Sequence, residues 1–136
     1  MIRPRALQVV ALKRKIALNE VKREAARLAE EIDRLEKRLA QVDELALAYR
    51  DHLAIPGLSP TELRSTMQIL TRLTERKDVD GARREILEVE RVRLAALLAE
   101  RKRQIDRIEE EERASRLAER LEKEARRESL MPARRH

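Results

Sequence analysis

The chain has few of the residues from which compact cores and redox sites are usually built. Among its 136 residues there is no Cys, no Trp and no Phe, and Tyr49 is the single aromatic residue. The absence of Cys excludes disulfides, thiolate metal sites and cysteine nucleophiles. The shortage of aromatic side chains argues against a compact globular core, because such side chains supply much of the buried area in small cores.

Glycine, proline and long apolar runs are also scarce. Two Gly and four Pro leave little material for loops, and no apolar stretch approaches the ~20 residues that span a bilayer as a helix. The apolar run near the start is short, is followed at once by Lys13, Arg14 and Lys15, and lacks a small-residue cleavage site. We therefore expect no signal peptide, and the composition fits a cytoplasmic protein.

Most of the chain consists of Ala, Leu, Glu, Lys and Arg, and 43% of all residues are charged. This composition is typical of long helices and coiled coils. The formal net charge is +6, and the basic residues gather at the ends. Residues 1–23 hold seven basic side chains against Glu20 alone, and Arg126, Arg127, Arg134 and Arg135 lie near the other end. A basic end of this kind can meet an acidic protein surface, a nucleic acid or anionic lipid.

A regular spacing of apolar residues predicts one long helix over about residues 5–54. Alternating steps of four and three residues from Leu7 to Leu53 meet an apolar or aromatic side chain at every position except Arg14. A heptad pattern sustained this far indicates a coiled-coil strand. The expected seam positions are Leu7, Ala11, Arg14, Leu18, Val21, Ala25, Leu28, Ile32, Leu35, Leu39, Val42, Ala46, Tyr49 and Leu53.

The stretch at residues 55–59 predicts a turn, followed by a second helix over about residues 60–128. Pro56 and Gly57 form a strong helix break. Ser59 is a good N-cap, Pro60 stands at the first helical position, and Glu62 completes a capping box. A basic tail is expected at residues 129–136.

The second helix has a less regular apolar pattern than the first. We expect its seam to slip in phase once, as at a coiled-coil stutter, and Gly81 to be a soft point or a kink. The seam residues expected before the slip are Leu63, Met67, Leu70, Leu73, Val79, Ala82, Ile86 and Val89. Those expected after it are Leu94, Leu98, Arg101, Ile105 and Ile108, and a final segment carries Ala114, Leu117, Leu121 and Ala125 at helical spacing.

A short turn forces the two helices to run antiparallel. The expected fold is therefore all-α, with two long helices forming an antiparallel coiled-coil hairpin in a single domain, 1–136. If the turn is centred near Gly57, Leu7 should lie near Arg107. The longer second helix should then overhang at the end that carries both termini, where the basic residues collect.

No pattern in the chain points to an enzyme, a cofactor or a small-molecule substrate. The two histidines, His52 and His136, lie far apart, and there is no Gly-rich phosphate loop. The fragment "DVDG" fails as a calcium loop, because Arg76 and Leu87 stand where carboxylates are required. We therefore expect no metal site. Nucleic-acid binding by the basic end is the less favoured alternative, since stacking aromatics are absent and residues 109–112 are all acidic.

Both ends of the expected hairpin carry more apolar residues than a two-stranded seam needs. Leu45, Leu47 and Ile69 are surplus near the turn, and they either form a docking surface or thicken the seam. Near the start, Val9, Val10, Leu12 and Ile16 lie beside basic residues and extend the seam in the same way.

With these features the chain resembles the FliJ family, small coiled-coil proteins of the flagellar type III export apparatus. The resemblance covers the whole chain and includes the two-helix layout, "YRDHL" closing the first helix and the charged "AERLEKEARR" tail. It implies a protein at the cytoplasmic face of the flagellar basal body that acts as the central stalk of the export ATPase. The end with both termini would enter the FliI-like ATPase hexamer, and a face nearer the turn would contact the export gate protein FlhA.

The resemblance also suggests which residues meet these partners. Matching positions for the export gate are Val42, Leu45, Tyr49, Ile69 and Leu73, although Leu45 stands where the family commonly has an aromatic residue. The basic end offers Lys13, Arg14, Lys15, Lys22 and Arg23 to the ATPase ring. Export chaperones are a further implied partner, and membrane contact is expected only through the gate. A related injectisome stalk and a general coiled-coil scaffold or export-substrate chaperone remain alternatives, and the free chain is either a monomer or a dimer.

Overall fold

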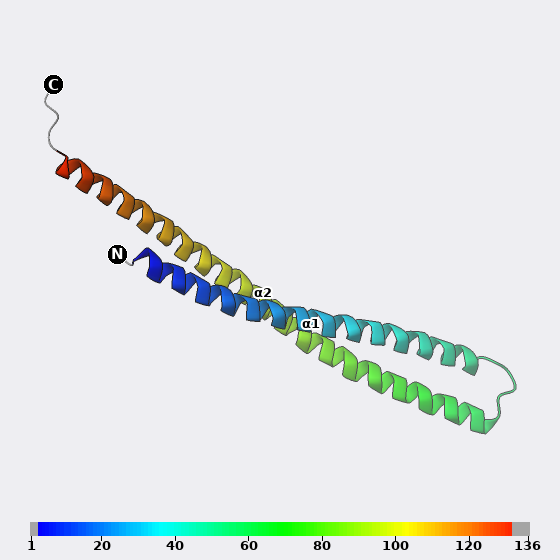
Figure 1. The fold of residues 1–136 in the computed structure, drawn as a ribbon. Coiled ribbons are helices and arrows are strands. Elements are labelled where there is room, and N and C mark those ends of the chain that lie inside the picture. Colours follow the sequence, from blue (N-terminus) through cyan, green and yellow to red (C-terminus); the bar gives the residue numbers. More distant parts are fainter. Residues whose placement is uncertain (1–2, 132–136) are drawn as a thin grey trace. The chain divides into compact units, whose positions relative to one another are not determined.

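The structure is a computed structural model, and it describes residues 3–131. Helix α1 spans Pro4–Leu53 and helix α2 spans Pro60–Leu130 (Figure 1). The two helices pack against each other, and the described residues contain no strand. The predicted all-α helical hairpin is confirmed.

The connection between the helices is formed by residues 54–59. Helix α1 ends in two tightened turns, where the N–H groups of Ala54 and Ile55 each donate to a carbonyl three residues back, both at 3.2 Å. Gly57 has a φ of 86°, a left-handed conformation that other residues adopt only with strain. Ser59 Oγ accepts a hydrogen bond from the Glu62 N–H at 3.1 Å, so the predicted N-cap is confirmed.

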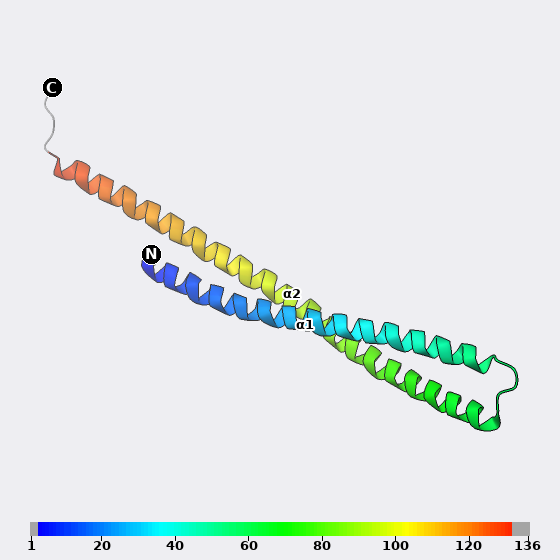
Figure 2. The same ribbon diagram turned by 45° about the vertical axis from the view of Figure 1, so that its right-hand side comes forward.

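Contacts divide the chain into two compact units. The turn unit consists of residues 24–95, and the terminal unit combines the beginning of α1, up to Arg23, with α2 from Ala96 onward. In each unit a segment of α1 packs antiparallel to a segment of α2 (Figures 1 and 2).

The predicted seam of α1 is confirmed along its whole length. Each of its fourteen positions, from Leu7 to Leu53, is buried or half-buried, and almost every other residue of the helix is exposed. The reason is that apolar residues occupy nearly every position of one face, so a single orientation of the helix buries them all.

The predicted seam of α2 is confirmed at Leu94, Leu98, Arg101, Ile105 and Ile108, which are all buried or half-buried. Before Leu94 the seam differs from the prediction, and the predicted phase slip is wrong. Its central positions recur at every seventh residue without interruption: Thr66, Leu73, Asp80, Leu87, Leu94, Arg101, Ile108 and Ser115. Leu73, Arg101 and Ile108 are half-buried, and the other five are buried. The predicted seam residues Val79, Ala82, Ile86 and Val89 are all exposed instead. A continuous heptad buries only one phase, and the phase that contains Leu87 and Leu94 prevails even though it places Asp80 inside.

The pairing of the helices is also shifted relative to a turn centred on Gly57. In the terminal unit Lys15 Nζ lies 2.6 Å from Glu109, and in the turn unit Asp43 lies 2.9 Å from Lys77 Nζ. Both partners on α2 lie further along the chain than a turn centred there predicts, whereas Glu31 pairs with Arg83 as such a turn predicts. The expected pairing of Leu7 with Arg107 stays a prediction.

Within the terminal unit, α2 is longer than the segment of α1 beside it. Ala118 is its last half-buried residue, and every residue from 119 to 130 is exposed. Both views show α2 continuing past the beginning of α1 (Figures 1 and 2). Residues 129 and 130, expected in a basic tail, are the last two of α2. The remainder of that tail, residues 132–136 with Arg134 and Arg135, lies outside the described residues.

Gly81 does not break α2, which runs through it as one helix. A Cβ atom added at Gly81 would meet nothing within 4 Å. In the part of the chain that the structure describes, no helix has the length and apolar character needed to cross a membrane.

Candidate functional site

The residues matched to the export gate all belong to the turn unit, but they differ in exposure. Val42 is buried, and Tyr49, Ile69 and Leu73 are half-buried, so these four belong to the seam or its edge. Leu45 is the exposed member of the set, with 49% of its surface accessible. Leu47 and Met67 are exposed in the same unit. The accessible apolar surface near the turn therefore includes Leu47 and Met67, which the family resemblance did not suggest as contacts for the gate.

The basic residues offered to the ATPase ring all belong to the terminal unit, and they fall into two groups. Lys13, Lys22 and Arg23 are exposed. Arg14 is half-buried in the seam, where its guanidinium donates to Gln104 Oε1 at 2.7 Å. This hydrogen bond explains how the seam of α1 accepts its one charged position.

Lys15 is exposed, but its charge is engaged by α2. The hydrogen bond and ion pair with Glu109 raise the pKa of Lys15. The same contact lowers the pKa of the Glu109 carboxyl. Lys13, Lys22 and Arg23, in contrast, hold no ion pair among the described residues.

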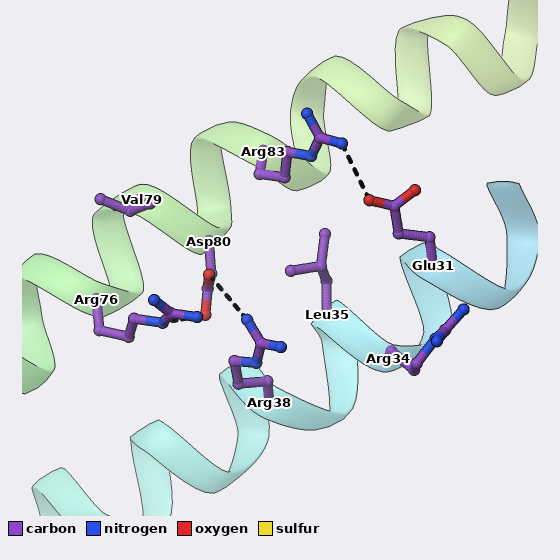
Figure 3. Close-up of a pocket in the computed structure, with 8 residues that line it drawn as sticks. All are labelled: Glu31, Arg34, Leu35, Arg38, Arg76, Val79, Asp80 and Arg83. Atoms are coloured by element: carbon purple, nitrogen blue, oxygen red, sulfur yellow. Dashed lines mark hydrogen bonds and ion pairs between the residues drawn. The ribbon is translucent and has the colours of Figure 1, made fainter.

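A buried charge lies in the seam of the turn unit, at Asp80 (Figure 3). Only 3% of Asp80 is exposed. Its Oδ1 lies 3.6 Å from Arg38 Nη1, and its Oδ2 lies 3.2 Å from Arg76 Nε. The contact at Oδ2 is close enough for an ion pair but lacks hydrogen-bond geometry, so this oxygen accepts no hydrogen bond from the described residues. Two cations thus compensate the buried carboxylate electrostatically, while one of its oxygens remains incompletely satisfied.

The surroundings of Asp80 form an open pocket of about 430 Å³ between residues 31–38 of α1 and 76–83 of α2. The walls carry four arginines, and Figure 3 shows Arg83 reaching across to Glu31, 3.0 Å away. Most of the charges here bind each other across the seam. This arrangement can fix the register of the helices, as polar seam positions do in coiled coils. The described residues contain no group of three His, Asp or Glu side chains suited to a metal ion.

Sequence reasoning missed Asp80 because it followed the apolar residues of α2. The signal that identifies it is the seven-residue period of Leu73, Leu87 and Leu94, which passes through residue 80. Oppositely charged residues on the facing helix, such as Arg38, accompany it.

An apolar stripe on the outside of α2 was also misassigned, because it was expected in the seam. Val79, Ile86 and Val89 are 62%, 64% and 72% exposed. Val92 continues the stripe, and together with Glu85 it lines a shallow hollow.

The acidic residues near this outer stripe of α2 differ in their partners. Hydrogen bonds from Arg91 and Arg93 lower the pKa of the Glu88 and Glu90 carboxyls, respectively. Asp78 and Glu85, in contrast, take part in no ion pair among residues 3–131.

Comparison with known proteins identified no relative. No protein-family model, no curated protein and no solved structure matches the chain.

Proposed function

We propose that the chain is a component of a flagellar or related type III protein export apparatus. In this proposal the terminal unit enters the ring of the export ATPase and raises its rate of hydrolysis, and the turn unit contacts the export gate. The site of action would be the cytoplasmic face of the basal body. The main observation in support is the overhang of α2, a helix end that no other described part of the chain covers.

The overhang has the character of a segment that inserts into a partner. Leu121 within the overhang is 56% exposed, and Leu117, just before it on the same face of α2, is 53% exposed. An isolated helix of this length is marginal in water, so contacts with another protein would stabilise it. The exposed cations Lys13, Lys22 and Arg23 belong to the same unit and would meet acidic groups of the partner.

The exposed apolar residues near the turn support a second contact. Leu45, Leu47 and Met67 are all about half exposed or more, and the seam does not need them. Exposed apolar side chains that the hairpin does not use are candidates for contacts with a partner. In the proposal they dock on the export gate, with Tyr49 at the edge of the contact.

The central experiment mixes the purified chain with the export ATPase and measures the rate of ATP hydrolysis. We expect the chain to raise the rate, and Leu117→Glu with Leu121→Glu to abolish the increase. The matched control is Leu47→Glu, also on an exposed site but in the turn unit, which should stimulate like the unaltered chain. Absence of both stimulation and complex formation would refute the stalk role.

A second experiment concerns the gate. Leu45→Ala with Tyr49→Ala should weaken binding to the cytoplasmic part of the gate protein while the helix content by circular dichroism is unchanged. Loss of helicity in this variant would show that the two residues serve only the hairpin.

A general coiled-coil scaffold or export-substrate chaperone is the second candidate. The observation in its favour is the outer stripe of α2, which belongs to neither proposed contact. A scaffold would bind secreted subunits and leave the ATPase rate unchanged, so the first experiment separates the two functions.

A further inference from the structure

The outer stripe of α2 has the spacing of a coiled-coil seam. Its members Val79, Ala82, Ile86 and Val89 are separated by three, four and three residues, and all four are exposed. They lie on a different face of the helix from the buried residue Leu87. The turn unit thus presents a second helix-packing surface that its own α1 segment does not cover.

The charges beside this stripe indicate what would cover it. Asp78 and Glu85 flank the stripe on one side and are seven residues apart. Neither forms an ion pair within the described residues. Two such stripes packed antiparallel against each other would place Glu85 beside its own copy, which is repulsive. The acidic flank instead suits a basic amphipathic helix.

The beginning of α1, in the terminal unit, has the matching properties. Val9, Leu12 and Ile16 repeat the spacing of three and four residues and are 48%, 59% and 54% exposed. They lie opposite the buried seam residues of that helix, such as Ala11. Lys15 and Lys22 follow the same flank, again seven residues apart.

We propose that the outer stripe of α1 in one copy of the chain docks antiparallel on the outer stripe of α2 in a second copy. Val9 then packs against Val89, Leu12 against Ile86, and Ile16 against Ala82. In this register the basic flank faces the acidic flank, and Lys22 faces Asp78. Lys15 lies opposite Glu85, but it is already paired with Glu109 of its own chain.

The charges favour this orientation over the reverse one. A parallel arrangement would bring Glu85 close to Glu20. On the other flank of the antiparallel pairing Arg83 approaches Lys13, but Arg83 is neutralised by its ion pair with Glu31. The two surfaces belong to different parts of the chain, so the contact is heterologous and adds copies head to tail.

Three apolar layers make a small interface, so the association is weak and salt-dependent. It concerns copies of this chain alone, and the ATPase assay above neither requires nor tests it.

The test uses two full-length variants, each of which breaks one stripe. Leu12→Glu damages the stripe of α1, and Ile86→Glu damages that of α2. Both residues are more than half exposed, so circular dichroism should show unchanged folding. Leu47→Glu is the matched control outside both stripes. Association is measured by sedimentation velocity up to about millimolar concentration, the range for such weak contacts.

We expect the unaltered chain and Leu47→Glu to associate as concentration rises, and each stripe variant alone to stay monomeric. An equimolar mixture of the two variants should form a one-to-one dimer and stop there, because each supplies the stripe that the other lacks. Asp78→Lys should weaken association about tenfold, and mixing it with Lys22→Glu should restore it. The proposal is overturned if the unaltered chain stays monomeric, if Leu12→Glu still associates alone, or if the mixture does not.

Discussion

The two helices of the turn unit contribute to one seam but distribute their apolar residues differently. Helix α1 places its apolar side chains inside, at positions such as Leu28, Ile32 and Leu35. Helix α2 buries Asp80 and exposes Ile86. The comparison shows that α1 buries an unbroken apolar face and leaves a few apolar residues such as Leu45 and Leu47 outside it, whereas α2 divides its apolar residues between the hairpin and a second, outer stripe.

The largest change in stability is expected when an inner apolar residue of α2 is compared with an outer one. Leu94 is only 1% exposed, and Leu94→Ala should lower the free energy of unfolding by about 2–5 kcal/mol. Val89→Ala, on the outer stripe, should change it by less than about 0.5 kcal/mol. Urea denaturation followed by circular dichroism measures both, and equal losses would mean that the outer stripe also packs within the molecule.

The next test replaces the buried carboxylate of α2 with an apolar group like those of α1. Asp80→Leu should raise the free energy of unfolding, because an apolar residue of similar size removes the desolvation penalty of the buried charge and leaves unpaired only the half-exposed Arg38 and Arg76. Arg38→Met should act in the opposite direction, since it leaves Asp80 with Arg76 alone. Thermal melts compare the two variants, and a lower melting temperature for Asp80→Leu would show that the ion pairs stabilise the seam more than packing would.

A smaller effect is expected at the glycine next to this charge. Gly81→Ala should stabilise α2 by about 1 kcal/mol, because the position is helical and the added Cβ meets open space. Gly57→Ala should instead destabilise the turn by about 1 kcal/mol, since φ is positive there. The same sign for both would contradict the assignment of one glycine to a helix and the other to a left-handed turn. Melting temperatures distinguish the signs.

The smallest effect concerns the exposed pair Lys15–Glu109 of the terminal unit. The pKa of Glu109 is lowered from its usual 4.5, so its contribution is present at neutral pH and is lost as pH falls through the lowered value. The pKa of Lys15 is raised from 10.5, so its contribution is lost as pH rises through the raised value. Stability curves of the unaltered chain and Glu109→Gln should therefore differ slightly between these limits and converge in acid. A gap that widened in acid would contradict the pairing.

The sequence was sufficient to predict the hairpin, the cap at Ser59 and the whole seam of α1. These features depend on local signals, namely a turn, a capping residue and an uninterrupted apolar face. The inner face of α2 was predicted from Leu94 onward but not before it, because Val79 and Ile86 mark the outer face as strongly as Leu87 and Leu94 mark the inner one. Which face is buried depends on α1 and its charged flanks, and this tertiary information overrides the local pattern.

The candidate surface residues show the same contrast between what local sequence signals predict and what the packing of the two helices determines. Lys13, Lys22 and Arg23 were expected to be accessible and are exposed, since a basic side chain rarely enters a seam. Arg14 is the exception, because Gln104 on the other helix accepts its hydrogen bond. Val42 was expected to meet a partner and is buried, because its place in the heptad of α1 determines its orientation.

The turn at residues 54–59 also has a consequence for how the chain folds. Each contact between the helices closes a loop, and the loop lengthens with distance from the turn, from 48 residues for Arg84 with Glu36 to 90 for Arg14 with Gln104. Once the contacts near the turn have formed, each further pair of residues closes only a short additional loop and so costs little conformational entropy. We therefore expect the helices to pair progressively from residue 59 outward. Substitutions near the turn should then slow folding, whereas substitutions near Arg14 should mainly speed unfolding, a contrast that stopped-flow kinetics can measure.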